Sequence, residues 1–426
     1  MQVRALQRLL ATAWLASAGA ACAQECEVGV DCAGVALNGM YSGDWRRNTT
    51  GGLETGAAYA NKLILGANWR VESLFEEARI SGSASVMYLS GDAISGDYVG
   101  DLQGLNNIEA DAGWYLNEVW TEFAFGGDTH TTLRAGVLDL NAEFDVTPTS
   151  LMFVAAPFGV GTDISQSGAT GPSIFPLTGL GIRAAGERDG GLGWRLGVYD
   201  GAPGNDGSRG FANLHVSSDE GVLAIGELVY HSEHVNKMSL GAWGYSAGFA
   251  PIDTALNPDA APESGNRGFY ALVDLPLGVA GDRRFDGSLR LGTANERFNA
   301  VDRFAAASLV ATGVWPGRPE DQLGVGVAWA HTGESYRNSQ AFAGAPATAA
   351  EILWELSYGT SLTEWLALKP GVQFVQHPGA DASLADSWVL GLRFELSTDR
   401  SWKLMARRDP RGEHAVASIG TAERTK

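Results

Sequence analysis

Apolar residues alternate with polar or small residues over most of the chain, in segments of about ten residues separated by Gly, Asp, Asn and Pro. The alternation is clearest in residues 384–397, where Trp388, Leu390 and Leu392 share one parity while Gly391 and Arg393 share the other. A period of two residues places alternate side chains on opposite faces of a β-strand. The pattern therefore predicts strands along the whole chain, and helical periodicity is nearly absent.

Fifteen segments show this alternation. Single-chain bacterial outer-membrane barrels have an even number of strands, so we expect sixteen strands, one of which is missed or merged. The predicted strands cover residues 55–70, 73–90, 114–125, 131–139, 178–186, 193–200, 221–231, 237–248, 267–275, 284–293, 304–314, 322–332, 350–359, 364–376 and 384–397.

Two architectures contain many alternating strands, a soluble sandwich or propeller and an outer-membrane barrel. Here the non-apolar parity is rich in Gly, Ala and Ser with isolated Arg or Glu, and aromatic residues recur at the ends of the apolar parity. Small inward residues fit a water-filled lumen, and terminal aromatic residues fit the two membrane interfaces. The sequence predicts an all-β fold, a transmembrane antiparallel β-barrel.

The first 23 residues have the composition of a secretory signal peptide. Two arginines precede an uncharged apolar run, and Ala21-Cys22-Ala23 forms an A-x-A cleavage site, so we expect the mature chain to begin at Gln24. A lipoprotein signal ending at Cys22 is the weaker alternative, because Gly19 replaces the large aliphatic residue expected there. The sequence thus predicts an exported protein.

Four regions follow from these patterns. They are a signal peptide (1–23), an N-terminal periplasmic segment (24–52), a barrel domain (53–397) and a charged C-terminal extension (398–426). Cys26 and Cys32 remain after cleavage, and they form either a small disulfide loop or two free thiols.

The charge balance excludes some partners. The chain is 45% hydrophobic with a net charge of -19, which becomes -21 without the two arginines of the signal peptide. An acidic chain is a poor ligand for nucleic acid or for an anionic membrane surface. We therefore expect no nucleic-acid partner.

Residues 133–183 contain a strand, a long connection and a return strand. The alternation stops at Asp139, and Asn141, Glu143 and Asp145 follow before a connection rich in Gly, Pro and Ser. Connections of this length inside a compact domain are usually functional. We predict a loop near residues 139–177 that folds into the barrel.

The same stretch resembles the carbohydrate-selective outer-membrane porins of the OprB type. Similar short motifs follow in the same order over about residues 51–397. The resemblance implies an outer-membrane location and passive, sugar-preferring diffusion into the periplasm, without catalysis and without a cofactor. The motifs are Arg134–Asp145, Pro157–Gly159, Gly171–Gly181, Gly51–Gly56, Asn106–Glu109, Tyr199–Gly204, Tyr270–Asp274, Glu351–Tyr358, Pro370–Pro378 and Leu390–Phe394.

One feature departs from this family. The resemblance implies a last strand that ends in an aromatic residue, the signal for barrel assembly, whereas charged residues up to Lys426 follow Leu396 here. The missing strand could therefore lie in Ser401–Ala406.

Strand parity places several charged residues inside the barrel. If Leu133 and Val137 face lipid, Arg134 faces the lumen, and the same argument applies to Glu118, Glu122, Arg183, Arg195, Arg290, Glu355 and Arg393. Such residues either contact a sugar, together with the aromatic rings of Phe144 and Phe158, or form ion pairs that hold the barrel and its loop in shape. The candidate substrate-binding residues are Arg134, Asp139, Asn141, Glu143, Asp145, Glu118, Glu122, Arg183 and Arg290.

Other chemistry finds little support. Gly244–Gly248 matches the G-x-S-x-G motif of acyl hydrolases, but Phe249-Ala-Pro cannot begin the helix that this motif requires. His231 and His234 lack a third ligand nearby, so we expect no metal site. A general cation-preferring porin is the main alternative, followed by an outer-membrane enzyme or an adhesin-like barrel.

The expected partners follow from the porin interpretation. They are mono- or oligosaccharides, outer-membrane lipid and the barrel-assembly machinery, with a homo-oligomer as an open option.

Overall fold

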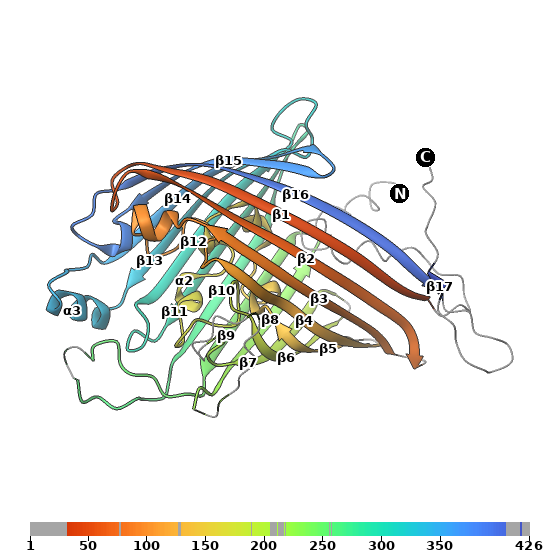
Figure 1. Ribbon diagram of the computed structural model, residues 1–426, viewed down its shortest axis with the longest axis horizontal. Helices are drawn as coiled ribbons and strands as arrows, with labels where there is room; N and C mark the ends of the chain where they lie inside the picture. The colour runs from red at the N-terminus through yellow and green to blue at the C-terminus, as the bar shows by residue number, and fades with distance from the viewer. Residues whose placement is uncertain are drawn as a thin grey trace.

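Long antiparallel strands form one closed barrel (Figure 1). The computed structural model describes residues 32–405, except residues 76–77, 127–128, 189, 205–210, 212–216, 218, 255 and 257, together with Ser418–Ile419. Each strand pairs with the next in sequence, and the first pairs with the sixteenth, which closes the sheet. The prediction of a sixteen-stranded transmembrane β-barrel is confirmed.

The strands have the following bounds in chain order. They are β1 (Cys32–Thr50), β2 (Gly56–Phe75), β3 (Ala78–Gly91), β4 (Gly113–Phe125), β5 (Thr129–Leu138), β6 (Gly179–Arg188), β7 (Leu192–Asp200), β8 (Val222–Ser232), β9 (Val235–Tyr245), β10 (Arg267–Ala280), β11 (Arg283–Ala294), β12 (Val301–Thr312), β13 (Gln322–Thr332), β14 (Ala350–Thr363), β15 (Leu366–Gln376), β16 (Ser387–Met405) and the two-residue β17 (Ser418–Ile419), which pairs with the end of β16.

The helices are short and lie in the connections. Among the described residues, no helix is long and apolar enough to cross a membrane. The helices are η2 (Ser95–Val99), η3 (Leu140–Ala142), η4 (Pro148–Met152), η5 (Ala156–Phe158), α2 (Thr162–Ser165), α3 (Glu334–Phe342) and η6 (Pro378–Ala380).

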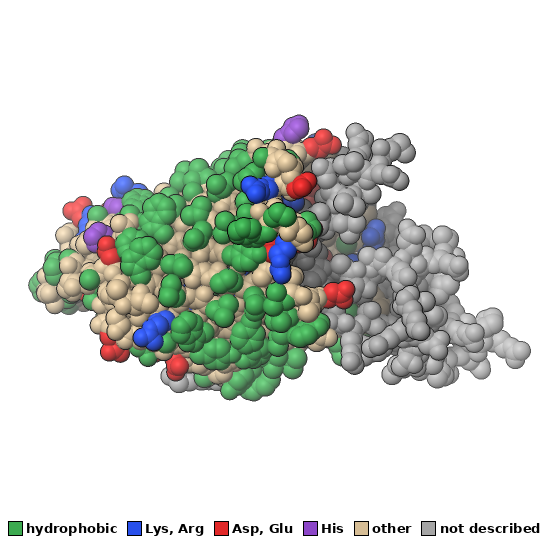
Figure 2. Space-filling model, turned by 90° about the horizontal axis from the view of Figure 1, so that it is seen from above, with side chains coloured by type: hydrophobic (Ala, Val, Ile, Leu, Met, Phe, Trp, Pro, Cys, Tyr) green, Lys and Arg blue, Asp and Glu red, His purple; other side chains and the backbone are tan. Residues whose placement is uncertain are grey.

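The two parities of the strands face the two sides predicted from the sequence. Leu196, Trp354 and Trp388 point outward and are 57%, 43% and 49% exposed, whereas Arg183 and Glu355 point inward and are buried. Figure 2 shows the result on one face, a broad hydrophobic surface with charged side chains gathered toward its ends. This distribution fits a wall that contacts lipid outside and polar groups inside.

The missed strand is β1, in the segment that we expected to be periplasmic. Its alternation is weak because its inward positions, such as Asp44 and Arg46, are polar while Gly39 and Gly43 occupy outward positions. The alternative location in Ser401–Ala406 is wrong, since β16 continues without a break to Met405. The barrel therefore extends past both boundaries of the expected barrel domain, 53–397. The expected signal peptide and Cys26 lie outside the described residues.

The extension of β16 leads to a truncation test. Thr398–Met405 pairs with Cys32–Gly39 of β1, and each lost backbone hydrogen bond costs about 0.5–1.5 kcal/mol. A chain ending at Ser397 should therefore unfold at a lower temperature than the full-length chain, measured by heat-dependent mobility on a gel. A chain ending at Met405 is the control and should behave as the full-length protein; equal stability of the two truncations would contradict the assigned pairing.

The two ends of the barrel differ in the length of their connections. At the end of the barrel opposite Cys32 and Met405, long loops join β3 to β4, β5 to β6, β9 to β10 and β13 to β14 (Figure 1). The opposite end has tight turns, such as the one between β8 and β9, where Ser232 pairs with Val235. Outer-membrane barrels place long loops outside the cell and short turns in the periplasm, so the long loops are extracellular.

Candidate functional site in the barrel lumen

The predicted loop between β5 and β6, residues 139–178, folds into the lumen and packs against the inner wall. Phe153 and Phe158, with ring centroids 4.6 Å apart, join Phe304 of β12 in one apolar cluster. Phe144 and Ile164 join Tyr199 of β7 and neighbouring residues in another. The loop therefore has its own hydrophobic core with the barrel wall, which holds it across the lumen.

This packing corrects the expected role of two aromatic residues. We expected Phe144 and Phe158 to offer rings to a sugar, but they are 0% and 3% exposed. A ring without accessible surface cannot stack on a solute. Both rings instead stabilise the loop by burying apolar surface.

A buried ion-pair group fixes the middle of the loop to β11. The Arg290 guanidinium contacts Asp145 with both Nε and Nη2, at 2.9 and 3.0 Å, and its third nitrogen pairs with Asp163. Asp145 also accepts a hydrogen bond from the backbone nitrogen of Gly161 at 2.9 Å. Asp145 and Arg290 are both buried. These two candidate residues therefore have no surface left for a solute and instead hold the loop.

Two further carboxylates of the wall bind the loop backbone. Glu355 of β14 accepts hydrogen bonds from the nitrogens of Val154 and Ala155, both at 2.9 Å. Glu227 of β8 accepts one from the nitrogen of Asp145 at 3.1 Å and pairs with Arg195 at 2.9 Å. Parity placed Glu355 and Arg195 inside the barrel, and the structure shows that Glu355 anchors the loop while Arg195 pairs with a second anchor.

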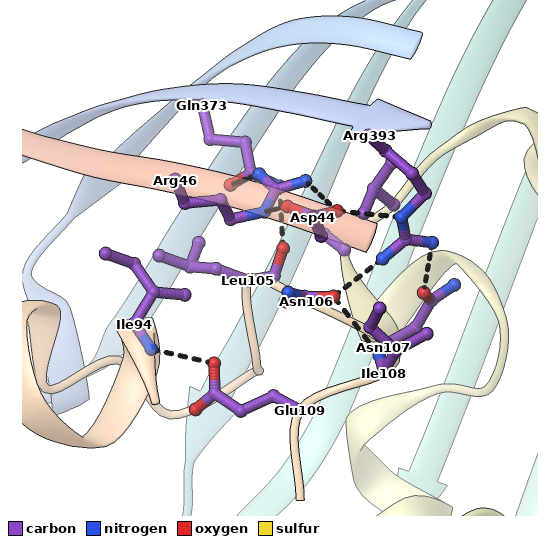
Figure 3. A network of polar contacts seen from close by, with 12 residues as sticks. Asp44, Arg46, Ile94, Leu105, Asn106, Asn107, Ile108, Glu109, Gln373 and Arg393 are labelled. Carbon is purple, nitrogen blue, oxygen red and sulfur yellow. Dashed lines mark hydrogen bonds and ion pairs between the residues drawn. The ribbon is translucent and has the colours of Figure 1, made fainter. Parts of the chain in front are cut away.

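A second inward segment, residues 92–112 between β3 and β4, was not predicted. Arg393 of β16 donates to the side-chain oxygens of Asn106 and Asn107, at 2.6 and 2.7 Å, and pairs with Asp44 of β1 at 2.7 Å (Figure 3). Gln373 of β15 donates to the carbonyl of Leu105 at 2.9 Å. The three strands β1, β15 and β16 thus hold this segment against the wall.

One glutamate of the wall also holds residues 92–112, and a second glutamate stabilises the segment from within. Glu351 of β14 accepts hydrogen bonds from the nitrogens of Leu102 and Gln103 at 2.7 and 3.1 Å. Glu109 accepts one from the nitrogen of Ile94 at 2.9 Å (Figure 3), and burial raises its pKa to about 7. The sequence contained a signal for this segment in its length, because the connection between two predicted strands exceeds twenty residues.

Four charged side chains of the lumen form one cluster of ion pairs, in which Arg183 is buried and the other three keep exposed surface. Arg134 of β5 contacts Glu122 at 3.0 Å and Glu143 at 2.9 Å, and Arg183 of β6 contacts the same two carboxylates at 2.6 and 2.5 Å. The side chains of Arg134, Glu122 and Glu143 are 18%, 15% and 21% exposed. The structure therefore brings together four of the nine candidate residues. They come from the three adjacent strands β4, β5 and β6 and from the loop, and we name them the four-charge cluster.

Trp120, which contacts this cluster, was missed in the sequence, as were Lys62 and Phe175. Trp120 lies under Arg134, with the guanidinium carbon 3.9 Å from the ring centroid. Lys62 of β2 lies over the ring of Phe175, at 5.1 Å from its centroid. Parity along β2 could have identified Lys62, because Leu65 on the opposite parity is outward and exposed, but the position of Phe175 depends on the loop.

The remaining candidates lie at the root of the loop. Asp139 caps η3 by accepting a hydrogen bond from the nitrogen of Asn141 at 2.8 Å, and its own nitrogen donates to Glu118 at 3.2 Å. The Asn141 amide donates to the carbonyls of Phe144 and Gly159, at 3.1 and 3.0 Å. These three side chains shape the loop where it leaves β5.

The hydrolase motif has no catalytic surroundings. After Ser246 the chain forms a bridge between Phe249 and Glu263 instead of a helix, and the Ser246 hydroxyl accepts a hydrogen bond from the nitrogen of Val222 at 2.9 Å. In the part of the chain that the structure describes, no group of three or more potential metal ligands occurs.

Comparison with known proteins identifies the family. The family model described as "Carbohydrate-selective porin, OprB family" matches residues 54–397. The chain belongs to this family. Porin B of Pseudomonas aeruginosa is 21% identical over 396 residues, covering 83% of this chain and 86% of the relative.

Solved structures agree on the fold of this porin. A structure titled "High pH structure of Pseudomonas putida OprB" superposes with a TM-score of 0.76 at 20% identity and covers 86% of this chain and 94% of that one. The outer-membrane channel DcaP of Acinetobacter baumannii superposes with a TM-score of 0.51 at 8% identity, covering 86% and 97%. Both similarities support a porin barrel.

Membership of the family decides between the functions left open by the sequence. The protein is a carbohydrate-selective porin of the bacterial outer membrane, and a porin is a channel, not an enzyme. The sugar-preferring function that the motifs implied is therefore confirmed, in place of a general cation-preferring pore.

Proposed function

We propose that sugars cross the narrow part of the lumen in contact with the four-charge cluster. The observation that supports this most directly is accessibility: Arg134, Glu122 and Glu143 keep exposed surface, whereas the Asp145 and Arg290 side chains are 0% and 6% exposed. Most wall residues of the two apolar clusters lie on β7 to β14. We infer that the passage runs past β4, β5 and β6, the strands that carry Glu122, Arg134 and Arg183.

The charges of the cluster suit a neutral polyhydroxyl solute. Two arginines face two glutamates, so the formal charges cancel and the field on a passing ion is weak. Hydroxyl groups both donate and accept hydrogen bonds, and the cluster offers guanidinium donors beside carboxylate acceptors. Weak contacts at several such groups allow a sugar to enter without being trapped.

The test is liposome swelling with refolded protein, comparing glucose, a disaccharide and an uncharged amino acid. Arg134→Ala should slow sugar entry about tenfold, the effect of losing one hydrogen bond to a charged group, and the unbalanced carboxylate that it leaves should raise cation selectivity in planar bilayers. Arg183 keeps Glu122 and Glu143 paired in this variant, so the loop should stay in place.

The matched control is Arg297→Ala, which removes an arginine from an exposed pair with Glu263 in the extracellular loops. Swelling rates for sugar should not change in this control. If Arg134→Ala transported sugar at the rate of the control, the proposed contact with the four-charge cluster would be wrong, although the family's carbohydrate function would stand.

We propose the wider partners on more general grounds. The outward side chains of the barrel are apolar, which suits outer-membrane lipid, and a barrel of this kind requires the barrel-assembly machinery for insertion. Whether the sugar is a mono- or an oligosaccharide depends on the width of the passage. Self-association stays a prediction, and its measure is the mass of the detergent-solubilised protein.

A further inference from the structure

The outer surface of β7 to β11 carries a groove that the porin function does not use. The groove has a volume of about 510 Å³ and is lined almost entirely by apolar side chains, among them Leu240, Ala271, Val273, Leu289 and Leu291. Ala271 is the small residue of the group, and Leu240 and Leu291, 65% and 50% exposed, lie on the two neighbouring strands at its level. An apolar groove on a membrane-facing wall has the chemistry to hold an acyl chain.

Cationic side chains lie above the extracellular end of this groove. Arg303 of β12 is in register with Thr293 of β11, which is in register with Phe269 of β10. These three residues form a row across the strands, and the row lies two residues, about 7 Å along the strands, from the row that contains Ala271 and Leu291. Arg267 lies a further two residues up β10, so a pair of arginines from strands about 10 Å apart overlooks the groove.

Both arginines are exposed on the outward parity of their strands. The Arg303 side chain is 62% exposed, and its Nε contacts Asp302 at 3.3 Å, which orients the guanidinium at the wall. Arg267 is also exposed and shares its parity with the outward Phe269. In the loops above, Arg297 and Glu263 neutralise each other with contacts of 2.5 and 2.7 Å.

We propose that this face of the barrel binds a phosphorylated lipid of the outer leaflet. The phosphate lies between Arg267 and Arg303, and an acyl chain fills the groove over Ala271. Charge complementarity selects this occupant, because arginine pairs with phosphate in a bidentate manner and the arginines lie at the extracellular end, where the lipid head groups are. The exposed Phe269 ring bridges the two parts at the interface, as aromatic residues do in outer-membrane barrels.

The test uses refolded wild-type porin in detergent and purified lipopolysaccharide as the probe, with binding followed by the rise in unfolding temperature. The double variant Arg267→Gln/Arg303→Gln should bind about 30-fold more weakly, since each arginine near a lipid surface contributes about a factor of five. Ala271→Trp should also weaken binding, by filling the groove without changing the charge. The rate of sugar swelling should not change in either variant, which shows that the barrel is folded.

The matched control is Arg47→Gln, which removes another exposed arginine at the extracellular end of a strand, on β1 and distant from the groove. This control should bind as the wild type does, and Arg267→Lys/Arg303→Lys should bind with an affinity between those of the wild type and the double Gln variant, because lysine keeps the charge but not the bidentate contact. Lipopolysaccharide without its lipid A phosphates should bind weakly. The proposal is overturned if the double Gln variant binds as tightly as the control, or if the wild type binds the dephosphorylated lipid or phosphatidylethanolamine equally well.

Discussion

Arg290→Ala is expected to release the loop of residues 139–178 from the barrel wall and to widen the pore. The substitution leaves Asp145 and Asp163 buried without the cation that pairs with both. Breaking a buried ion pair by removing one partner costs about 3–5 kcal/mol. Single-channel conductance in planar bilayers should therefore rise, and liposome swelling should become ordered by solute size instead of favouring sugar.

The control for this prediction lies on the same strand. Arg284 pairs with Asp286 at 2.8 Å, but its side chain is 44% exposed, so Arg284→Ala should leave conductance and selectivity close to those of the wild type. A wild-type conductance in Arg290→Ala would mean that the apolar clusters and the hydrogen bonds from the loop backbone to Glu355 and Glu227 are sufficient to hold the loop.

Arg393→Ala is expected to detach the second inward segment, residues 92–112, while leaving the four-charge cluster in place. Arg393 is buried, and its loss removes the donors to Asn106 and Asn107 and one of the two arginines that contact Asp44. Hydrogen bonds to charged groups contribute about 1.5–3 kcal/mol each. Amide hydrogen exchange in residues 92–112 should accelerate by two orders of magnitude or more.

Arg47→Ala serves as the comparison, because Arg47 points outward from the same part of β1 that carries Asp44 inward. Exchange in residues 92–112 should not change in that variant. If Arg393→Ala left exchange at the wild-type rate, the contacts of Glu351 and Gln373 would be sufficient to hold the segment. The rate of liposome swelling with sugar, measured on both variants, tests whether residues 92–112 take part in the sugar passage.

Much of the barrel could be predicted because strand pattern is a local property. Fifteen of the sixteen long strands were found from alternation, and the parity of Arg134, Arg183, Arg393 and Glu355 placed each of them on the correct side of the wall. The strand that was missed, β1, has glycines on its outward face and so lacks the apolar alternation on which the prediction relied. A barrel strand with a weak pattern is defined by its neighbours, since both β2 and β16 pair with it.

The candidate site was predicted as a set of residue types but not as an arrangement. The stretch from Arg134 to Asp145 contains members of two separate groups in the structure, Glu143 in the four-charge cluster and Asp145 in the buried ion pair. In an irregular loop, the side chains of two residues that are two positions apart do not point in fixed relative directions. No periodic pattern in the sequence could therefore assign Glu143 and Asp145 to different groups. Phe144, between the two, is buried in the apolar cluster.

The sequence by itself determined the alternation of apolar and polar faces in fifteen strands, the presence of a long connection rich in carboxylates after β5, and the inward direction of eight charged residues, because all three depend on neighbours close in the chain. Only the tertiary structure decided which charges meet. Arg290 and Asp145 are 145 residues apart, and Arg393 and Asn106 are 287 apart. Such pairs form because closure of the barrel and the packing of two loops inside it bring distant strands around one lumen, and the surface that this packing leaves uncovered is what a sugar can reach.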